Sequence, residues 1–396
     1  MYDAIVIGAR CAGSPTAMLL ARMGHRVLVV DRAEFPSDTV STHVVQAPAV
    51  AALSRWGLVD AATAGLQPMA RYSFDFGPIT IAGTPPPIDG FSAAYAPRRT
   101  VLDAVLVDAA AHAGAEVRPR FSVEEVLFED GAAVGIRGHD RAGRSVVERA
   151  RVVIGADGRH SMVARAVGAE SYHETPRGQW SYYTYFSGLP VDGFEIFIRP
   201  QRGWAAAPTN DGLTMLVLGW PYAEAAAYKA DPEANLLKTI ELAPAFAERV
   251  RAATREAPLT GTAIPGFFRK PYGPGWALVG DAGYNKDPIT AQGITDAFRD
   301  AALCATALDE AFSGRRSFND AMAAYQSARD TQVLPLYGFT MDMATLAPPP
   351  PEMQQLLGAV CGNQPAMDSF VGINAGTVSP AEFFDPANIG RLLAPV

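Results

Sequence analysis

Three glycine-containing turns, each directly after a short apolar run, constrain this chain more than any other feature of its sequence. They lie at residues 8–13, at 155–158, and from Gly280-Asp281 onward. Such apolar runs are typical of buried parallel strands, and open α/β sheets bind ligands at the carboxyl ends of those strands. One turn of this kind is a weak signal, but three in this order predict a single sheet that binds a dinucleotide.

The first turn has the features of a phosphate-binding loop that opens a helix, which we expect over residues 12–23. Gly8 permits the tight turn, and Gly13 permits close packing of helix on strand. Asp31 ends the next strand, about 20 residues beyond the glycines, where a carboxylate hydrogen-bonds an adenosine ribose. Arg10 stands where the usual pattern has its middle glycine. Either the loop lies further from the pyrophosphate, or the guanidinium faces a phosphate or a neighbouring carboxylate.

The other two turns extend into longer motifs that resemble those of a known family. The stretch 155–161 resembles the second motif of the flavoprotein hydroxylases of the para-hydroxybenzoate hydroxylase type, and 280–295 resembles their third motif in spacing. That family also includes geranylgeranyl reductases and flavin-dependent halogenases. The resemblance covers nearly the whole chain and implies FAD as cofactor. The chain departs from the family at Tyr284, Ala291 and Thr295, where histidine, glycine and asparagine are common.

The resemblance also implies which residues contact FAD. Asp281 is expected to bond the ribityl chain, and Arg99, which leads a helix, to lie near the pyrophosphate or the ribityl chain. Backbone amides around Gln292 are expected to face the pyrimidine ring, and Val123 to flank the adenine. With the first turn included, the expected cofactor-binding residues are Gly8, Arg10, Ala12, Gly13, Asp31, Arg32, Arg99, Val123, Asp157, Gly280, Asp281, Pro288, Ala291, Gln292 and Gly293.

Composition excludes several other classes of protein. The net charge of −8 argues against nucleic-acid binding, which needs a basic surface. The sequence has no apolar run of eighteen residues and begins directly with a strand, so we expect neither a transmembrane helix nor a signal peptide. Cys11, Cys304 and Cys361 are isolated and odd in number, which favours a reducing cytoplasm and no metal site. Oligomeric state is left open.

The expected fold class is α/β: a Rossmann-like FAD-binding domain with an inserted antiparallel β-sheet substrate domain and a C-terminal helical segment. We expect a hairpin turn at 210–212, a strand over 259–268 and a helix over 318–334. The expected boundaries are 1–70, 98–175 and 269–335 for the FAD-binding domain, 71–97 and 176–268 for the substrate domain, and 336–396 for the C-terminal extension.

The inserted block is rich in aromatic residues and has no helical periodicity, so we expect a dry substrate pocket there. Because side chains alternate across a strand, Tyr183 and Tyr185 share one face. Each aromatic residue taken singly is equally compatible with an ordinary sheet core. The expected pocket residues are Tyr183, Tyr185, Phe197, Trp204 and Trp220.

His43 is the one candidate catalytic side chain. It lies in a polar loop that the resemblance places near the flavin ring, where an imidazole can donate to the flavin or to a substrate oxygen. The alternative is a helix-entry residue, with Ser41 or Thr42 as the cap and His43 partly exposed.

These features leave four functional hypotheses. The leading one is an FAD-dependent monooxygenase that uses NAD(P)H and oxygen to hydroxylate an aromatic or polycyclic small molecule through a flavin C4a-hydroperoxide. The first alternative is a geranylgeranyl-reductase-like ene reductase, although the sequence has no long apolar stretches suited to a polyprenyl tunnel. The second is a flavin-dependent halogenase. Those enzymes share a motif with two tryptophans, and the corresponding stretch of this chain has only one, Trp204. A non-enzymatic flavin-binding module is the last.

Overall fold

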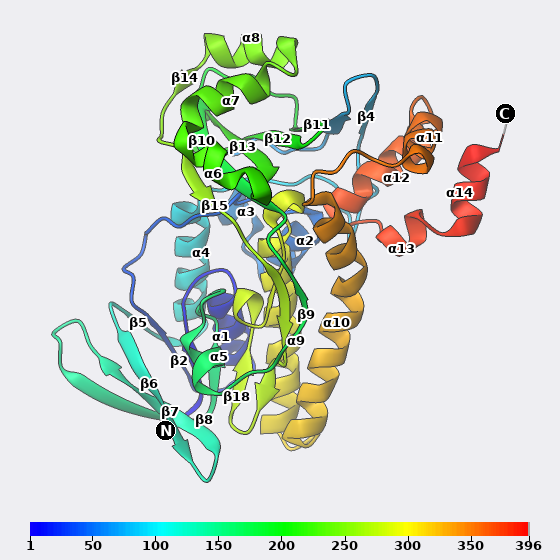
Figure 1. Ribbon diagram of the computed structural model, residues 1–396. Helices are drawn as coiled ribbons and strands as arrows, with labels where there is room; N and C mark the ends of the chain where they lie inside the picture. The colour runs from blue at the N-terminus through cyan, green and yellow to red at the C-terminus, as the bar shows by residue number, and fades with distance from the viewer. Residues whose placement is uncertain (395–396) are drawn as a thin grey trace.

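The first sheet is mostly parallel and carries the three glycine turns at one edge. The computed structural model describes residues 1–394. The strands are β1 Tyr2–Ile7, β2 Val27–Asp31, β5 Glu116–Pro119, β8 Ser145–Gly155, β17 Tyr272–Gly273 and β18 Trp276–Leu278. Their order is β17-β18-β8-β1-β2-β5, and every neighbouring pair from β18 to β5 is parallel (Figure 1). The apolar residues of these strands face layers on both sides, as a parallel sheet requires.

One face of this sheet is covered by helices. Ala4 and Val6 of β1 share a core with residues of α1, α2, α4, α9 and α10. The helices are α1 Gly13–Arg22, α2 Ala47–Trp56, α3 Val59–Thr63, α4 Arg99–His112, α9 Gly293–Phe312 and α10 Phe318–Met343. The expected helix over 12–23 is therefore confirmed to within one residue at each end.

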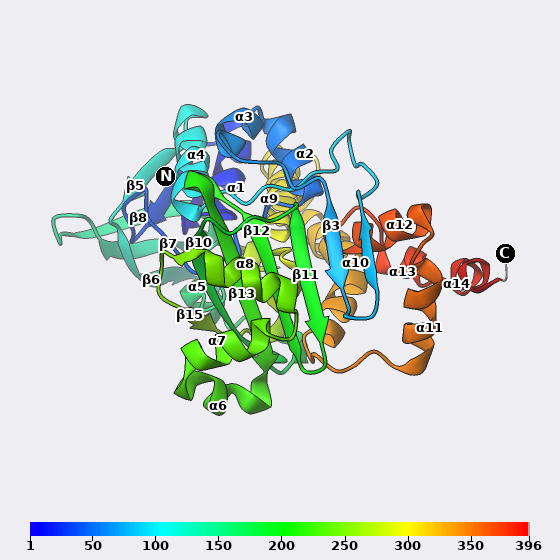
Figure 2. The same ribbon diagram turned by 90° about the horizontal axis from the view of Figure 1, so that it is seen from above.

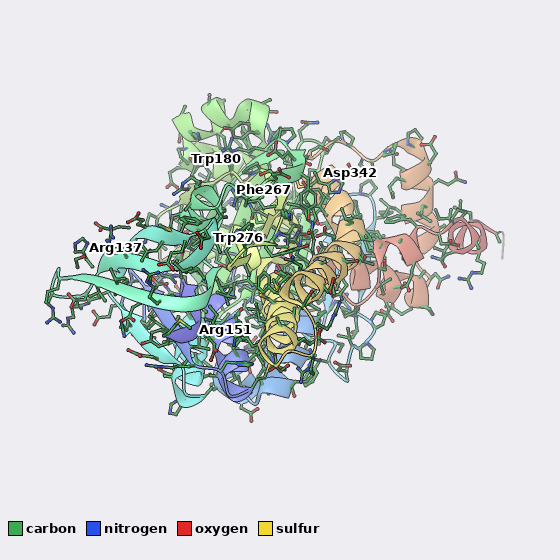
Figure 3. All side chains as sticks on the ribbon, turned by 90° about the horizontal axis from the view of Figure 1, so that it is seen from below. Arg137, Arg151, Trp180, Phe267, Trp276 and Asp342 are labelled. Carbon is green, nitrogen blue, oxygen red and sulfur yellow. The ribbon has the colours of Figure 1, made fainter. Side chains whose placement is uncertain are left out.

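The other face is covered by α5 (Met162–Ala166) and by an arm of two strands, β6 (Ser122–Glu129) and β7 (Ala132–His139). The arm continues from β8, with which β7 pairs in antiparallel register. In Figure 3, Arg137 lies on this arm at the edge of the molecule, whereas Trp276 of β18 lies within the body.

A second sheet combines strands from two separate parts of the chain. Its strands are β3 Tyr72–Asp75, β4 Thr80–Gly83, β10 Gln179–Ser187, β11 Phe194–Arg199, β12 Arg202–Pro208, β13 Leu213–Pro221, β14 Thr254–Arg255 and β15 Thr260–Thr262. The order is β14-β10-β13-β12-β11-β3-β4, with β15 beside β10. β11 and β3 are parallel, and the other pairs are antiparallel. The expected hairpin turn at 210–212 joins β12 to β13.

Different helices pack on the two faces of the second sheet, and Figure 2 shows one group over the strands and the C-terminal group beside β3 and β4. On the outer face lie α6 Ala225–Ala230, α7 Pro232–Ile240 and α8 Pro244–Ala252. On the inner face lie the C-terminal helices α11 Pro351–Val360, α12 Gln364–Ala375, α13 Pro380–Phe383 and α14 Pro386–Leu393. The fold class is therefore the expected one, a Rossmann-like α/β domain with an inserted β-sheet domain and a helical C-terminal segment.

Two expected elements have the wrong extent. The strand expected over 259–268 is two strands of different sheets, β15 and β16 (Gly266–Arg269), because Pro265 cannot donate to a ladder between them. β16 pairs with β9 (Ser171–Thr175) and β19 (Tyr284–Asn285) in a third sheet.

The helix expected to end at residue 334 continues through Pro335 to Met343. Val333, Tyr337 and Met341 follow one another at four-residue spacing and pack as one buried row. This burial outweighs the cost of a proline within a helix, which is about 3 kcal/mol. A boundary at residue 335 therefore falls inside α10.

Candidate functional site

The strand register brings the three glycine turns to one edge of the first sheet. Ile7 of β1 lies beside Val30 of β2 and Gly155 of β8, and Gly155 lies beside Leu278 of β18. The residues that follow these strands therefore meet at the carboxyl edge, where α/β sheets bind dinucleotides.

Gly8 and Gly13 leave no room for a side chain in the first turn. Gly8 has a φ of 102°, and a Cβ there would lie 2.4 Å from the carbonyl oxygen of Ala156. A Cβ on Gly13 would lie 1.8 Å from the carbonyl oxygen of Gly8. The turn therefore packs directly on the second motif, and the N-terminus of α1, which attracts phosphate, opens at this point.

Asp31 holds the loops at this edge. Its carboxylate accepts hydrogen bonds from the backbone N–H of Ala9 at 2.8 Å and of Ala33 at 2.7 Å. A carboxylate has about four acceptor positions, so Asp31 retains capacity for a ribose hydroxyl.

The guanidinium of Arg10 faces a neighbouring carboxylate, which is one of the alternatives expected from the sequence. It donates to Asp103 at 2.6 Å, and Asp103 also accepts from Arg99 at 3.0 Å. Asp103 is fully buried between the two guanidiniums, and the thiol of Cys11 lies 3.3 Å from it. Sequence reasoning missed Asp103, although its position four residues after Arg99 on one helix face was the signal.

Asp281 and Gly293 face open space at this edge. Both are exposed, whereas Gly280 and Gln292 beside them are buried. Protein crowds the Asp281 carboxyl from its other sides, and this desolvation raises its pKa to about 6 against the opposing charge of Arg99. Gly293 opens the 20-residue helix α9, and a Cβ placed there would meet no described atom within 4 Å apart from its chain neighbours and the backbone of α9 itself. The Asp281 carboxylate can accept from hydroxyl groups, and the N–H groups at the start of α9 can donate to a polar ring. Both features fit FAD, which has hydroxyls and a polar ring.

The remaining expected contacts lie around the same edge in different settings. Asp157 accepts from the N–H of Met162 at 2.7 Å and so also begins α5. Arg32 is exposed, and Val123 is half-buried in β6. Ala291 has a φ of 52° in the tight turn before α9.

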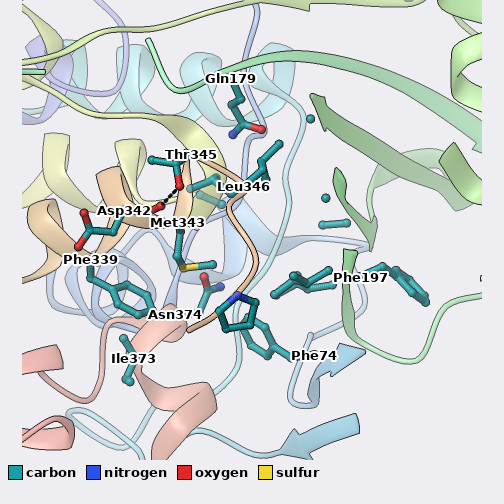
Figure 4. A pocket seen from close by; sticks show the side chains of 18 of the residues that line it. Phe74, Gln179, Phe197, Phe339, Asp342, Met343, Thr345, Leu346, Ile373 and Asn374 are labelled. Atoms are coloured by element: carbon teal, nitrogen blue, oxygen red, sulfur yellow. Dashed lines mark hydrogen bonds between the residues drawn. The ribbon is translucent and has the colours of Figure 1, made fainter. Parts of the chain in front are cut away.

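A cavity of about 720 Å³ adjoins the third motif (Figure 4). It lies between the inner face of the second sheet and the C-terminal helices, and Thr42, Pro288 and Ala291 border it on the side of the first sheet. Such a volume is within the range of small-molecule sites. Most of its side chains are apolar, among them Phe74, Phe194, Ile196, Met215, Val217, Phe339, Met343, Leu346, Leu357, Phe370 and Ile373.

Two of the aromatic residues expected in the pocket, Phe197 and Trp204, border the cavity, and Trp220 does not. The rings of Phe197 and Trp204 stack on each other and contact Phe246 of α8, on the outer face. Trp220 is also on the outer face, where its ring stacks on Tyr228. The rings of all three residues therefore pack on the outer face, because side chains alternate across each strand.

Tyr183 and Tyr185 share the inner face, as expected from strand alternation. They line a separate space of about 200 Å³ together with Asp38 and Arg98. On the same strand, Gln179 borders the larger cavity. The inner face of β10 therefore runs from one space to the other.

His43 is buried and positions Tyr185. Its Nδ1 lies 3.2 Å from the carbonyl oxygen of Ala96, and its Nε2 lies 3.0 Å from the Tyr185 hydroxyl. Because a carbonyl only accepts, Nδ1–H donates to Ala96 and Nε2 accepts from Tyr185. Burial lowers the pKa of His43 to about 4, so the ring is neutral at pH 7. The helix-entry interpretation is wrong, because α2 begins at Ala47 after Gln46 and His43 is fully buried.

Asp287 is a buried carboxyl that sequence reasoning missed. It accepts from Gln179 at 2.6 Å and from the N–H of Ile289 at 3.0 Å, while its second oxygen has no partner among the described residues. Burial raises its pKa to about 7. The Asp-Pro pair at a turn was the available signal.

Within residues 1–394, no group of three or more histidine, cysteine, aspartate or glutamate side chains is placed to hold a metal ion. No helix in this part of the chain is long and apolar enough to span a membrane.

The parallel sheet, the glycine turns and the open space beside Asp281 and Gly293, here called the cofactor cleft, are the features of an α/β protein that binds a dinucleotide. A family model described as an FAD binding domain matches residues 1–334. The chain belongs to this family, and its cofactor is FAD.

Individual relatives come from several enzyme classes. The chain is 28% identical over 322 residues to the digeranylgeranylglycerophospholipid reductase of Methanosarcina acetivorans, covering 79% of this chain and 76% of the relative. The myxobacterial chondrochloren halogenase CndH has a TM-score of 0.80 and 25% identity, covering 99% of this chain and 95% of CndH. PqsL of Pseudomonas aeruginosa, described as a probable FAD-dependent monooxygenase, has a TM-score of 0.73 and 22% identity, covering 86% and 94%, and shares the fold. The family resemblance expected from the motifs is therefore confirmed.

Proposed function

We propose that this protein is an FAD-dependent monooxygenase that uses NAD(P)H and oxygen to hydroxylate an apolar aromatic or polycyclic small molecule. The observation that carries the proposal is the cavity of about 720 Å³ with mostly apolar walls, bordered by Pro288 and Ala291 of the third motif. A substrate held there lies beside the expected flavin ring, and the reaction is shielded from water by the walls.

The chain's own residues divide the work between the cleft and the cavity. Gly8 and Gly13 shape the turn and pack it on the second motif, so that the N-terminus of α1 faces the pyrophosphate. Asp31 holds the ribose, and Asp281 holds the ribityl chain. Bound FAD supplies the redox chemistry. The protein supplies orientation and a dry site, and neutral His43 keeps the Tyr185 hydroxyl in a fixed direction.

An ene reductase is the second candidate, because the same apolar walls suit a hydrocarbon chain. Relatives named as digeranylgeranylglycerophospholipid reductases support it. In that case the double bond, and not oxygen, takes the electrons.

The experiment that separates the candidates is NAD(P)H oxidation by the FAD-loaded protein with a panel of phenolic, polycyclic and prenylated compounds, with and without oxygen. We expect turnover that needs oxygen and a product that is one oxygen atom heavier. Oxygen-independent saturation of an alkene would contradict the monooxygenase and favour the reductase. A halogenated product that forms only with added halide would contradict both.

A further inference from the structure

One polar side chain in the apolar cavity has no partner for its hydrogen-bond donor. Asn374 lies in the last turn of α12, borders the cavity and is 3% exposed. Its side-chain nitrogen has no hydrogen-bond partner among the described residues. Figure 4 shows the Asn374 amide among the side chains of the cavity, near Met343.

An amide in this position can be satisfied by a ligand in the cavity. A buried N–H without an acceptor is costly, whereas an apolar side chain of the same shape at the same place is not. The surrounding walls are apolar, so the missing acceptor is not supplied by the protein. A small molecule that fills the cavity can supply it.

The backbone of Asn374 fixes this amide relative to the third motif. The backbone carbonyl oxygen of Asn374 accepts from Gln292 Nε2 at 2.7 Å, and Gln292 is the buried residue directly before α9. The amide is therefore held where the cavity meets the expected flavin site.

The charged residues of the cavity are engaged or lie at its rim. Asp342 is exposed at the end of α10, and Arg199 is paired with Asp75 at 3.0 Å. A charged ligand inside would be buried without a counter-ion, which is strongly unfavourable. The interior thus favours an uncharged molecule.

We propose that Asn374 is a specificity-determining residue whose side-chain amide donates a hydrogen bond to a carbonyl or hydroxyl oxygen of an uncharged, otherwise apolar substrate. The proposal rests on the proposed function, because it takes the cavity as the substrate site.

The test compares two probes that differ in one oxygen. Fluorenone and fluorene have the same ring framework, and only fluorenone carries a carbonyl. Their dissociation constants are measured by titration calorimetry on the FAD-loaded full-length protein and on Asn374→Leu. We expect the preference for fluorenone over fluorene to fall about fivefold in Asn374→Leu, the value of one net neutral hydrogen bond. Fluorene should bind the variant as well as it binds the unaltered protein.

Two further variants make the result specific. Asn374→Asp keeps the size of the side chain but replaces the donor, so it should also lose the preference. Thr345→Val is the matched control, because Thr345 borders the cavity but its hydroxyl already donates to the carbonyl of Asp342 at 2.7 Å. Its preference should stay unchanged.

An unchanged preference in both Asn374 variants would overturn the role of Asn374 and leave the proposed function intact. Failure of both probes to bind the unaltered protein would overturn the cavity as the substrate site, and with it the role of Asn374.

Discussion

The cofactor cleft and the apolar cavity adjoin each other but are built by different means. The cleft is a backbone site, made by turns after parallel strands and by the N-termini of α1 and α9. The cavity is a side-chain site, made by one face of the second sheet and by helices more than 100 residues further along the chain. A backbone site demands particular residues, whereas an apolar wall accepts many residues of similar size. The comparison explains why the motifs identify the cofactor and leave the substrate open.

The two regions also differ in what a small change does. A Cβ added at Gly13 meets the carbonyl oxygen of Gly8, which cannot move without moving a strand end. A methyl-sized change in a hydrophobic pocket alters selectivity by only about 1–3 kcal/mol. Substitutions in the cleft should therefore affect cofactor binding, and those in the cavity should affect which molecule reacts.

The largest expected effect tests which side of the second sheet forms the cavity. Trp204 packs on Phe197 and Phe246 behind the sheet, so Trp204→Ala should lower the free energy of unfolding by about 3–5 kcal/mol. Urea unfolding of the FAD-loaded protein measures it. Ile196→Ala, on the inner face of the neighbouring strand, should destabilise less and change substrate binding more. A Trp204→Ala protein of normal stability but altered binding would reverse this assignment of faces.

That assignment also shows how far sequence reasoning reaches. Alternation correctly places Tyr183 and Tyr185 on one face, because it depends only on strand geometry. It cannot tell which face is inner, because this is decided by where α7, α8 and the C-terminal helices pack. Phe197 and Trp204 border the cavity while their rings pack on the outer face, and Trp220 packs on the outer face away from the cavity.

The cleft was more predictable because its signals are local. Gly8, Gly13 and Asp31 take their roles from strands and turns within about 30 residues, a scale on which spacing is informative. Asn374 had no such signal, and the Asp-Pro pair of Asp287 marks only a turn. Their significance comes from burial beside chain segments that are distant in sequence, and composition does not encode that.

The next effect concerns His43, which follows Thr42 of the cavity wall and contacts Tyr185. Its pKa is lowered to about 4 in the folded protein by burial, against 6.5 when unfolded. Between pH 6.5 and pH 4 the His43 side chain therefore binds a proton in the unfolded chain but not in the folded protein. Its protonation does not lower the free energy of unfolding above pH 6.5, and lowers it increasingly as the pH falls from 6.5 toward 4. Between pH 7.5 and 4.5 the unaltered protein should lose about 2–3 kcal/mol more than His43→Gln. Urea unfolding at both pH values gives the two differences. Equal losses in the two proteins would show that folding does not lower the pKa of His43.

A comparable effect is expected at Asp281, on cofactor affinity instead of folding. Its carboxylate should accept hydrogen bonds from the ribityl chain, so Asp281→Ala should weaken FAD binding by about 1.5–3 kcal/mol, roughly 10- to 150-fold. Quenching of flavin fluorescence on titration into apoprotein measures the dissociation constant. Asp108→Ala, an exposed position on α4, controls for the lost charge. Unweakened binding in Asp281→Ala would remove Asp281 from the cofactor site.

The smallest change in stability is expected for Gly293→Ala, which also tests whether FAD binds at the start of α9. Gly293 opens α9, and a Cβ added to it would meet nothing within 4 Å among the described residues apart from its neighbours and the backbone of α9. Gly293→Ala should therefore fold normally and gain up to about 1 kcal/mol of stability. If the flavin ring approaches this backbone, however, the added methyl group occupies its space and FAD should bind about fivefold more weakly, the loss of about one hydrogen bond. Gly358→Ala in α11 also has no neighbour within 4 Å among the described residues and should leave FAD binding unchanged. Unaltered affinity in Gly293→Ala would mean that the cofactor lies away from the start of α9, and the cavity beside Pro288 would then no longer adjoin its reactive ring.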